Sequence, residues 1–123
     1  MKNPSRIAVA AGTVAVFGMA LAAPAFAWEN TFTTTGSNIR LPDHSLSSGS
    51  HFVHGGVNNN CSGTVTVHWR RTVSGAPDPL IDQVSGAACN VEYYGDYKSV
   101  SSGTYHVDVD YGTKGKTGWA GVE

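Results

Sequence analysis

Apolar and polar residues alternate strictly along residues 64–73, the clearest periodic segment of the chain. Val65, Val67 and Trp69 share one face, and the positions between them are polar. A period of two with β-branched residues predicts a strand with one buried face. The alternation would place Arg71 inside, so we expect the strand to bulge or to leave the core near this residue.

A second alternating segment, Thr104 to Tyr111, is the strongest predicted strand. Its odd-numbered positions are aromatic or aliphatic, and its even-numbered positions are polar. Turn residues precede it at Ser101-Ser102-Gly103 and follow it at Gly112. The pattern predicts a strand that buries its odd-numbered face.

Shorter strands are predicted where apolar or β-branched residues lie between turn residues. They span Thr31–Thr35, Asn38–Leu41, His51–Val53, Leu80–Val84 and Asn90–Tyr94. Short strands separated by glycine or proline turns are typical of a sandwich or a small barrel. We therefore predict an all-β protein: a small single-domain β-sandwich, Ig-like or jelly-roll-like. It has about six to eight short antiparallel strands and one disulfide, and it follows a helical signal peptide.

Residues 1–27 have the composition of a secretory signal. Lys2 and Arg6 give a basic start, residues 7–23 carry no charge, and an A-x-A sequence ends the segment at Ala27. An apolar stretch of 17 residues is at the short limit for spanning a bilayer, which favours cleavage over a retained anchor. The sequence predicts cleavage after Ala27 and a single secreted domain over residues 28–123, with no stable membrane anchor.

The charge of the predicted mature domain argues against polyanionic partners. The whole chain has eight Lys and Arg and nine Asp and Glu. Loss of Lys2 and Arg6 leaves six basic and nine acidic residues, a net charge of −3. A mildly acidic domain without a basic cluster is a poor ligand for nucleic acid or for anionic membranes. We expect neither partner, and no cofactor.

Cys61 and Cys89 both lie in the predicted mature domain. Two cysteines of an exported chain are expected to pair with each other, because the compartment is oxidising. A metal pair or a redox pair is not suggested, since there is no C-x-x-C and 27 residues separate the two cysteines. We predict one disulfide between them.

The even-numbered face of the 104–111 strand carries the residues with the most chemistry. His106, Asp108 and Asp110 follow one another along this face, about 6.5–7 Å apart. If the 64–73 strand pairs alongside, His68 and Arg70 stand opposite, and the five residues form a candidate binding face. The two aspartates with His106 are also a weak candidate for a divalent ion, although successive strand positions converge poorly on one ion. The alternative is a solvated face with cross-strand Arg–Asp pairs.

The remaining polar residues do not form a catalytic motif. The chain contains no G-x-S-x-G. Asp108 and Asp110 are spaced as a glycosidase pair could be, but the sequence offers no further support for an enzyme. His44, His51 and His54 are interpreted as scattered surface histidines, because residues three apart point to opposite faces of a strand.

Aromatic residues are abundant and fall into two groups. Four lie on predicted inward faces and are expected in the core: Trp69, Tyr93, Tyr105 and Tyr111. Three are left over as candidate exposed aromatics: Tyr94, Tyr97 and Trp119. Exposed rings on a β-scaffold can stack on sugars or anchor a protein contact. The alternative is that they cover a second small cluster under loops.

The chain resembles the small secreted α-amylase inhibitors of the tendamistat type in its size, its all-β character and one run of residues, Cys61-Ser62-Gly63-Thr64-Val65-Thr66-Val67. The resemblance covers about ten residues. That family presents a Trp-Arg-aromatic triplet at an exposed turn. Here the nearest match is Trp69-Arg70-Arg71, which lies at a strand end and lacks the third aromatic residue. The family also has two disulfides where this chain can form one, so no site is transferred.

The leading functional hypothesis is a secreted, non-enzymatic binding or surface-associated protein. Its partner would be an extracellular protein or a carbohydrate, recognised by loops and one polar strand face. A second hypothesis is an inhibitor of an extracellular amylase or protease, which requires an exposed loop or strand end near Trp69-Arg70-Arg71. A third is a divalent-ion-binding module that uses His106, Asp108 and Asp110.

Overall fold

Strands β7 (Thr64–Arg71) and β11 (Gly103–Asp110) form the centre of the structure, where the alternation predicts them. The computed structural model describes residues 27–123. The two strands pair antiparallel, with Val67 opposite Val109 and Trp69 opposite Val107. Because side chains alternate between the two faces of a strand, this register places the apolar residues of both strands on one side.

The central pair belongs to a five-stranded sheet. β8 (Leu80–Ala87) pairs with β7, while β3 (Ile39–Arg40) and β4 (His44–Leu46) pair with different parts of β11. The register between β7 and β8 shifts between Trp69 and Arg70. This irregularity lies where the sequence predicts a bulge, next to the charge that strict alternation would bury.

A four-stranded sheet covers the apolar side of the first. Its order is β2 (Trp28–Thr35), β12 (Lys114–Val122), β6 (Val53–Asn58) and β9 (Tyr93–Tyr94). A two-stranded sheet of β5 (Gly49–His51) and β10 (Lys98–Val100) is separate from both.

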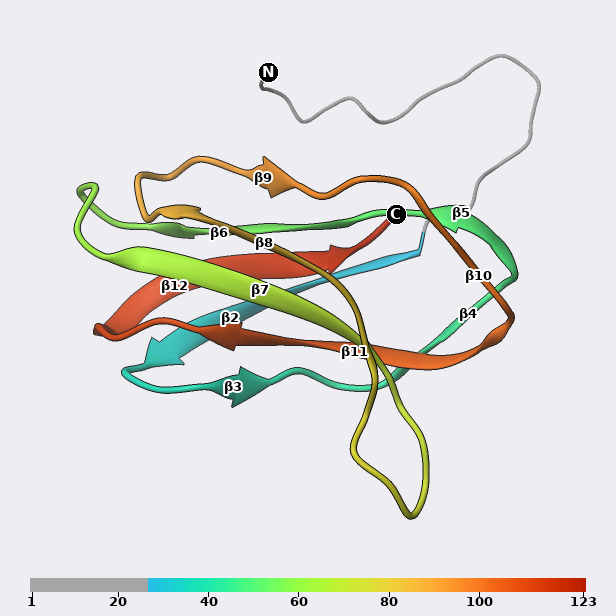
Figure 1. Cartoon of the computed structure of the whole chain (residues 1–123). Helices are drawn as coiled ribbons and strands as arrows, with labels where there is room; N and C mark the ends of the chain where they lie inside the picture. Colours follow the sequence, from blue (N-terminus) through green and yellow to red (C-terminus); the bar gives the residue numbers. More distant parts are fainter. Residues whose placement is uncertain (1–26) are drawn as a thin grey trace.

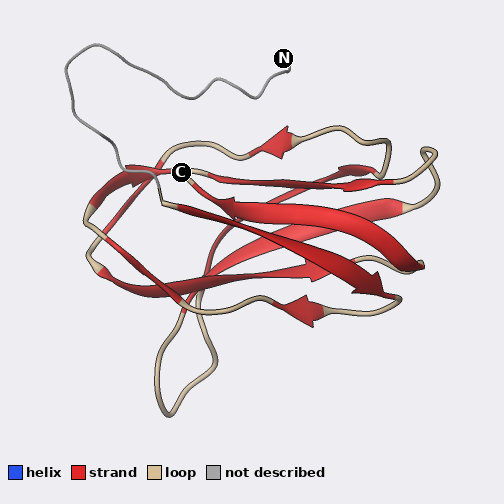
Figure 2. Ribbon diagram, turned by 180° about the vertical axis from the view of Figure 1, so that it is seen from behind, coloured by secondary structure: helices blue, strands red, loops and turns tan. Residues whose placement is uncertain are grey.

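The two larger sheets stack face to face as a β-sandwich (Figure 1). Trp69 and Val107 of one sheet and Val53 and Val122 of the other are completely buried between them. Tyr105 and Tyr111 are buried as predicted, and Tyr93 packs against this core. Figure 2 shows strands and loops, with no helix, in residues 27–123. The all-β sandwich class is confirmed.

The structure has more strands than the pattern predicts, eleven within residues 27–123. β12 is the longest of them, and the sequence analysis missed it. Its glycines at positions 115, 118 and 121 interrupt the alternation, and glycine has low strand propensity. The strand forms because β2 and β6 pair with it on both sides. Tertiary pairing therefore overrides local preference here.

Cys61 and Cys89 form the predicted disulfide, with their Cα atoms 4.1 Å apart. The bond joins the connection after β6 to the segment after β8, one from each large sheet. The backbone N–H of Cys61 also donates to the carbonyl oxygen of Ala88 at 2.8 Å. The disulfide thus joins two connections that each pass between the large sheets, β6 to β7 and β8 to β9.

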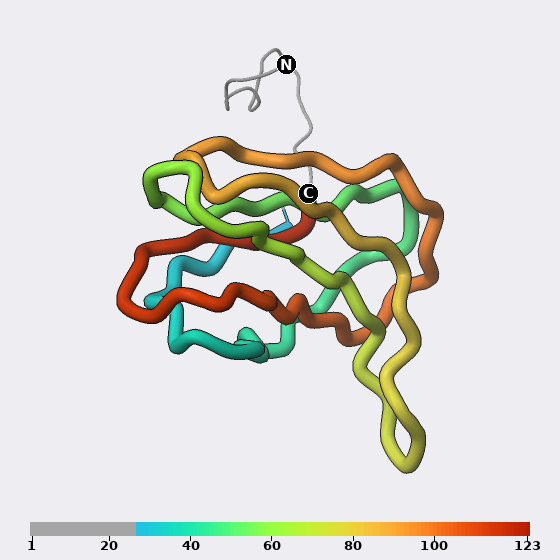
Figure 3. The backbone as a smooth tube through the Cα atoms, turned by 60° about the vertical axis from the view of Figure 1, so that its left-hand side comes forward, coloured from blue at the N-terminus to red at the C-terminus, as the bar shows by residue number. Residues whose placement is uncertain are grey.

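The connection between β7 and β8 projects from the body of the sandwich as a long hairpin loop, residues 72–79 (Figure 3). The N–H of Val73 donates to Oδ1 of Asp78 at 3.0 Å, which closes the base of the loop. The N–H of Arg71 donates to the carbonyl oxygen of Pro79 at 3.0 Å.

Residues 1–26 of the predicted signal peptide lie outside the described residues, so the signal and its cleavage remain predictions. Within residues 27–123 there is no helix with the length and apolar character needed to cross a bilayer.

Removal of the disulfide should destabilise the domain strongly. The two cysteines are 28 positions apart in sequence, and chain entropy for a loop of that size predicts a loss of about 3.5 kcal/mol. Urea unfolding of the Cys61→Ala/Cys89→Ala double variant measures this loss against the oxidised wild type. An unchanged free energy of unfolding would show that the cross-link does not stabilise the fold.

Candidate binding faces

The five predicted residues of the polar strand face lie together on the outer side of the five-stranded sheet. In the register of β7 and β11, His106 stands opposite Arg70 and Asp108 stands opposite His68. Asp110 is next along the same face of β11 and lies 3.7 Å from Nδ1 of His68. The cross-strand arrangement thus has the geometry that the alternation predicts.

Asp108 is the centre of this face, and its carboxylate is saturated by neighbouring side chains. Nε of Arg70 donates to Oδ2 at 2.7 Å, and the amide of Asn38 donates to Oδ1 at 2.8 Å. Nδ1 of His68 lies 3.0 Å from Oδ1. Asn38 also donates to Asp110 at 2.8 Å. A carboxylate with these partners is compensated by the protein itself, as buried charges require.

His106 belongs to a neighbouring cluster and not to a common site with the two aspartates. Its Nδ1 lies 2.8 Å from the hydroxyl of Thr72 and 3.3 Å from a guanidinium nitrogen of Arg40. Carboxylates of Asp43 and Asp78 lie 3.8 Å from its two ring nitrogens. The structure places His68, in place of His106, beside the aspartates.

The pKa of His106 is lowered from its ordinary value of 6.5. Burial is the largest cause, and the positive charge of Arg40 adds to it. The carboxylates of Asp78, Asp43 and Asp108 act in the opposite direction but do not reverse the shift. Since a guanidinium only donates, Nδ1 accepts in the contact with Arg40, which also suits the neutral imidazole. His106 is therefore a buried, neutral part of a structural network.

The triplet Trp69-Arg70-Arg71 lies at the end of β7, directly before the projecting loop of residues 72–79. Trp69 is completely buried in the core. Arg70 is paired with Asp108, and Arg71 lies over the ring of Tyr105 at 5.5 Å. The inward-facing alternation of β7 takes the indole into the sandwich, as the pattern predicts. The exposed loop that the inhibitor hypothesis requires near the triplet is present at residues 72–79, and that hypothesis stays a prediction.

The candidate exposed aromatics lie on the other large sheet or beside it. Tyr94 is 42% exposed and Tyr97 is 70% exposed, while Trp119 is half-buried. Phe52, which the sequence analysis did not single out, contacts both tyrosines edge-to-face, with ring centroids 5.7 and 5.1 Å apart. We call Phe52, Tyr94 and Tyr97 the aromatic platform.

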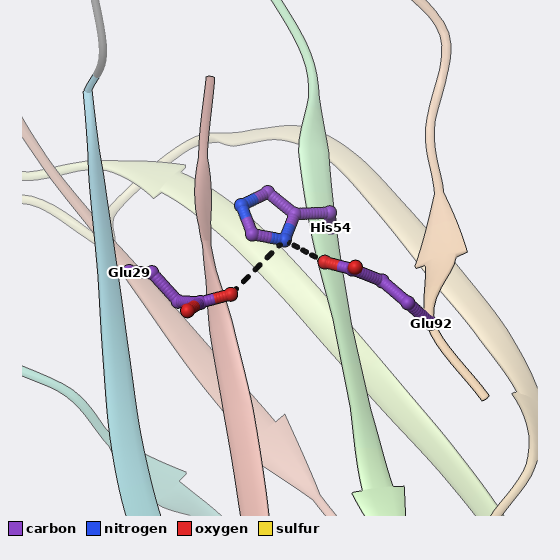
Figure 4. Close-up of side chains that lie close together, drawn as sticks. All are labelled: Glu29, His54 and Glu92. Atoms are coloured by element: carbon purple, nitrogen blue, oxygen red, sulfur yellow. Dashed lines mark hydrogen bonds and ion pairs between the residues drawn. The ribbon is translucent and has the colours of Figure 1, made fainter. Parts of the chain in front are cut away.

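His54 lies beside the aromatic platform. Figure 4 shows the carboxylates of Glu29 and Glu92 on either side of its Nδ1. Its Nδ1 contacts Oε2 of Glu92 and lies 3.8 Å from Oε2 of Glu29. Its Nε2 lies 3.7 Å from Oε2 of Glu123. The three carboxylates come from positions that are distant in sequence, and they meet around one imidazole.

Strand register explains why these residues meet. Gly121 of β12 stands opposite Glu29 of β2 on one side and opposite His54 of β6 on the other. A Cβ atom at Gly121 would come within 1.9 Å of the carbonyl oxygen of Trp28, so no other residue fits there. The glycine leaves the space between Glu29 and His54 free of a side chain, and their side chains meet above β12 (Figure 4).

The interpretation as scattered surface histidines is wrong for His51 and His54, which are buried, while His44 is half-buried. His54 is 2% exposed and His51 is 5% exposed. His51 bonds the carbonyl oxygen of Ser47 at 2.8 Å, and His44 stacks on Trp28 with ring centroids 4.7 Å apart. Three-residue spacing does not relate the histidines, because each lies in a different strand. Locally, His54 follows the apolar Val53 but precedes two glycines, which gives little signal for a buried histidine. Its carboxylate neighbours depend on strand pairing that no local pattern contains.

Comparisons with known proteins identify no family. No protein-family model matches the chain, and no curated protein matches it. Among solved structures, the chain is similar to the carbohydrate-binding module CBM6cm-2 from Cellvibrio mixtus lichenase 5A, determined in complex with cellotriose. The TM-score is 0.48 and the identity is 14%, over 79% of this chain and 86% of that chain. At this level the similarity carries no argument about function.

His106 should make the fold less stable in mild acid. Well above pH 6.5 the imidazole is neutral in both the folded and unfolded chains and contributes nothing to the pH dependence. Below that value the unfolded chain takes up the proton first, because the folded pKa is lower, and stability falls until the folded pKa is passed.

Urea unfolding of the wild type and of His106→Gln at several pH values between about 7.5 and about 5 tests this effect. The wild type should lose more free energy of unfolding than the variant over this range, since both share all other titrating groups. Parallel pH profiles would contradict the role assigned to His106.

Proposed function

We propose that the chain is exported, that residues 1–27 are removed, and that residues 28–123 form a non-enzymatic extracellular protein that binds carbohydrate. The binding surface is the aromatic platform, Phe52, Tyr94 and Tyr97, with the carboxylates beside it. The observation that carries this proposal is the exposure of two tyrosine rings, held by a third ring, next to a group of carboxylates on one sheet face.

The platform has the two kinds of group that recognise a pyranose. The π face of an aromatic ring carries partial negative charge and attracts the partially positive C–H groups of a sugar ring. Carboxylates and phenol oxygens accept hydrogen bonds from sugar hydroxyls. Tyr94 already donates to Oε1 of Glu92 at 3.2 Å, so an aromatic group and an acceptor are held side by side.

Phe52 positions the platform relative to the end of the chain. Its N–H donates to the carbonyl oxygen of Glu123 at 2.9 Å, and the N–H of Glu123 donates back to Phe52 at 2.9 Å. This pair continues the pairing of β6 with β12 beyond the last residues of the two strands. Because these backbone hydrogen bonds hold Phe52 in place, its ring is pre-organised, which lowers the entropic cost of binding.

The outer face of the five-stranded sheet is less suited to a ligand. Its carboxylate Asp108 is 7% exposed and satisfied by Arg70 and Asn38. A ligand that used it would have to break charge-assisted hydrogen bonds, which are the strong ones. The candidate face His68, Arg70, His106, Asp108 and Asp110 is therefore proposed as a structural network.

Loss of the two exposed tyrosines should weaken carbohydrate binding strongly without unfolding the domain. We expect the wild type to be retained on at least one insoluble or immobilised polysaccharide from a panel. The Tyr94→Ala/Tyr97→Ala variant should bind that polysaccharide more weakly by roughly ten-fold or more, the scale of a binding hot spot. Depletion isotherms measure both affinities.

Leu80→Ala is the matched control, because Leu80 is 47% exposed and lies on β8 of the other sheet. It removes an exposed apolar side chain away from the aromatic platform and should leave the affinity unchanged. Absence of retention on every polysaccharide, or equal binding by the tyrosine variant, would refute the carbohydrate proposal and favour a protein partner.

A further inference from the structure

His54 is the most deeply buried titratable side chain on the outer face of the four-stranded sheet. It is 2% exposed, and its Nδ1 contacts the carboxylate of Glu92. Its Nε2 is buried and has no hydrogen-bond partner among residues 27–123. Glu123 faces this atom at 3.7 Å, beyond hydrogen-bond distance. A buried ring nitrogen without a hydrogen bond is unfavourable, so the arrangement calls for a reason.

The ligand atoms of Glu29, His54 and Glu92 all lie within 4.8 Å of one another. Zinc–nitrogen and zinc–oxygen bonds are about 2.0–2.2 Å long, so two ligands of one ion lie about 3.4 Å apart in tetrahedral geometry. The 3.8 Å between Nδ1 of His54 and Oε2 of Glu29 is close to that spacing. The shorter contact of His54 with Glu92 must open to admit an ion.

We propose that Glu29, His54 and Glu92 bind a divalent transition-metal ion, with zinc the best match. One imidazole nitrogen and two carboxylate oxygens are ligands that zinc accepts, whereas calcium and magnesium take oxygen ligands alone. The ion binds Nδ1 of His54. Water completes the coordination, since Glu29 is 37% exposed and leaves a route from solvent.

The proposed site also accounts for Nε2 of His54. When the ion occupies Nδ1, the imidazole proton must be on Nε2. A metal-bound histidine almost always donates this proton to a carboxylate, a backbone carbonyl or water, and that partner fixes the ring orientation. Glu123 is in place for this role, with Oε2 at 3.7 Å, and a small movement of its half-exposed side chain completes the bond.

The second group with metal-like spacing, His68, Asp108 and Asp110, provides a contrast. There Arg70 and the amide of Asn38 occupy both oxygens of Asp108, and Asn38 also bonds Asp110. A cation would have to displace Arg70, which already donates to Asp108. We therefore do not expect His68, Asp108 and Asp110 to bind zinc, and this group serves as the control for the proposed site.

Isothermal titration of the purified protein, expressed from the full sequence, with zinc alone tests the site. The wild type should bind one zinc per chain, and chelator should lower its melting temperature back to that of the apoprotein. Cobalt should produce a visible absorption band from the same ligands. Glu29→Gln keeps size and hydrogen bonding, and it should weaken zinc binding by roughly ten-fold or more.

His54→Gln should abolish the cobalt absorption band. If this variant of a buried residue does not fold, Glu29→Gln still tests the metal site, because Glu29 is partly exposed. Asp110→Asn, in the contrasting group, should bind zinc like the wild type. The proposal is overturned if zinc does not bind stoichiometrically, if Glu29→Gln binds as tightly as the wild type, or if Asp110→Asn loses the ion. The tyrosine variant of the platform should still bind zinc, so the two proposals fail separately.

Discussion

The register between strands decides which side chains of this protein enter the core and which are presented on the surface. A shift of one residue moves every side chain of a strand to the opposite face. With Trp69 opposite Val107, the apolar residues of β7 and β11 face the second sheet, and their polar residues form the outer network around Asp108. With Gly121 between Glu29 and His54, the second sheet brings carboxylates to a buried imidazole. Both outer faces follow from these pairings.

The two faces use similar residue types differently. Around Asp108, an arginine and an amide donate to the carboxylate, so the charges are compensated within the protein. Around His54, carboxylates predominate, and exposed aromatic rings adjoin them. The first arrangement stabilises the pairing of β7 with β11. Through Asn38 it also joins β11 to the segment before β3. The second leaves acceptors and aromatic surface directed outward, which is the basis for proposing binding there.

The sequence predicts the two central strands of the first sheet well and the second sheet only in part. The predicted strands Thr31–Thr35 and Asn90–Tyr94 overlap β2 and β9, whereas β12 is missed. β7 and β11 alternate strictly because one face is buried and the other is solvated, so their period is visible locally. β12 is hidden because its inward positions are small, Gly118 and Ala120, and because glycine interrupts it. The group around His54 combines residues 29, 54, 92 and 123. No local pattern shows that β2, β12, β6 and β9 are neighbours, so their common site appears only with the fold.

Mapping of the bound ligand tests most directly which face of the sandwich is the binding surface. An NMR titration of the labelled protein with a soluble oligosaccharide of the retained polysaccharide should shift the backbone amides of Phe52, His54, Tyr94 and Tyr97. The amides of His68, Arg70 and Asp108 should not move. Shifts confined to β7 and β11 would contradict the account and would return the binding function to the polar face of the five-stranded sheet.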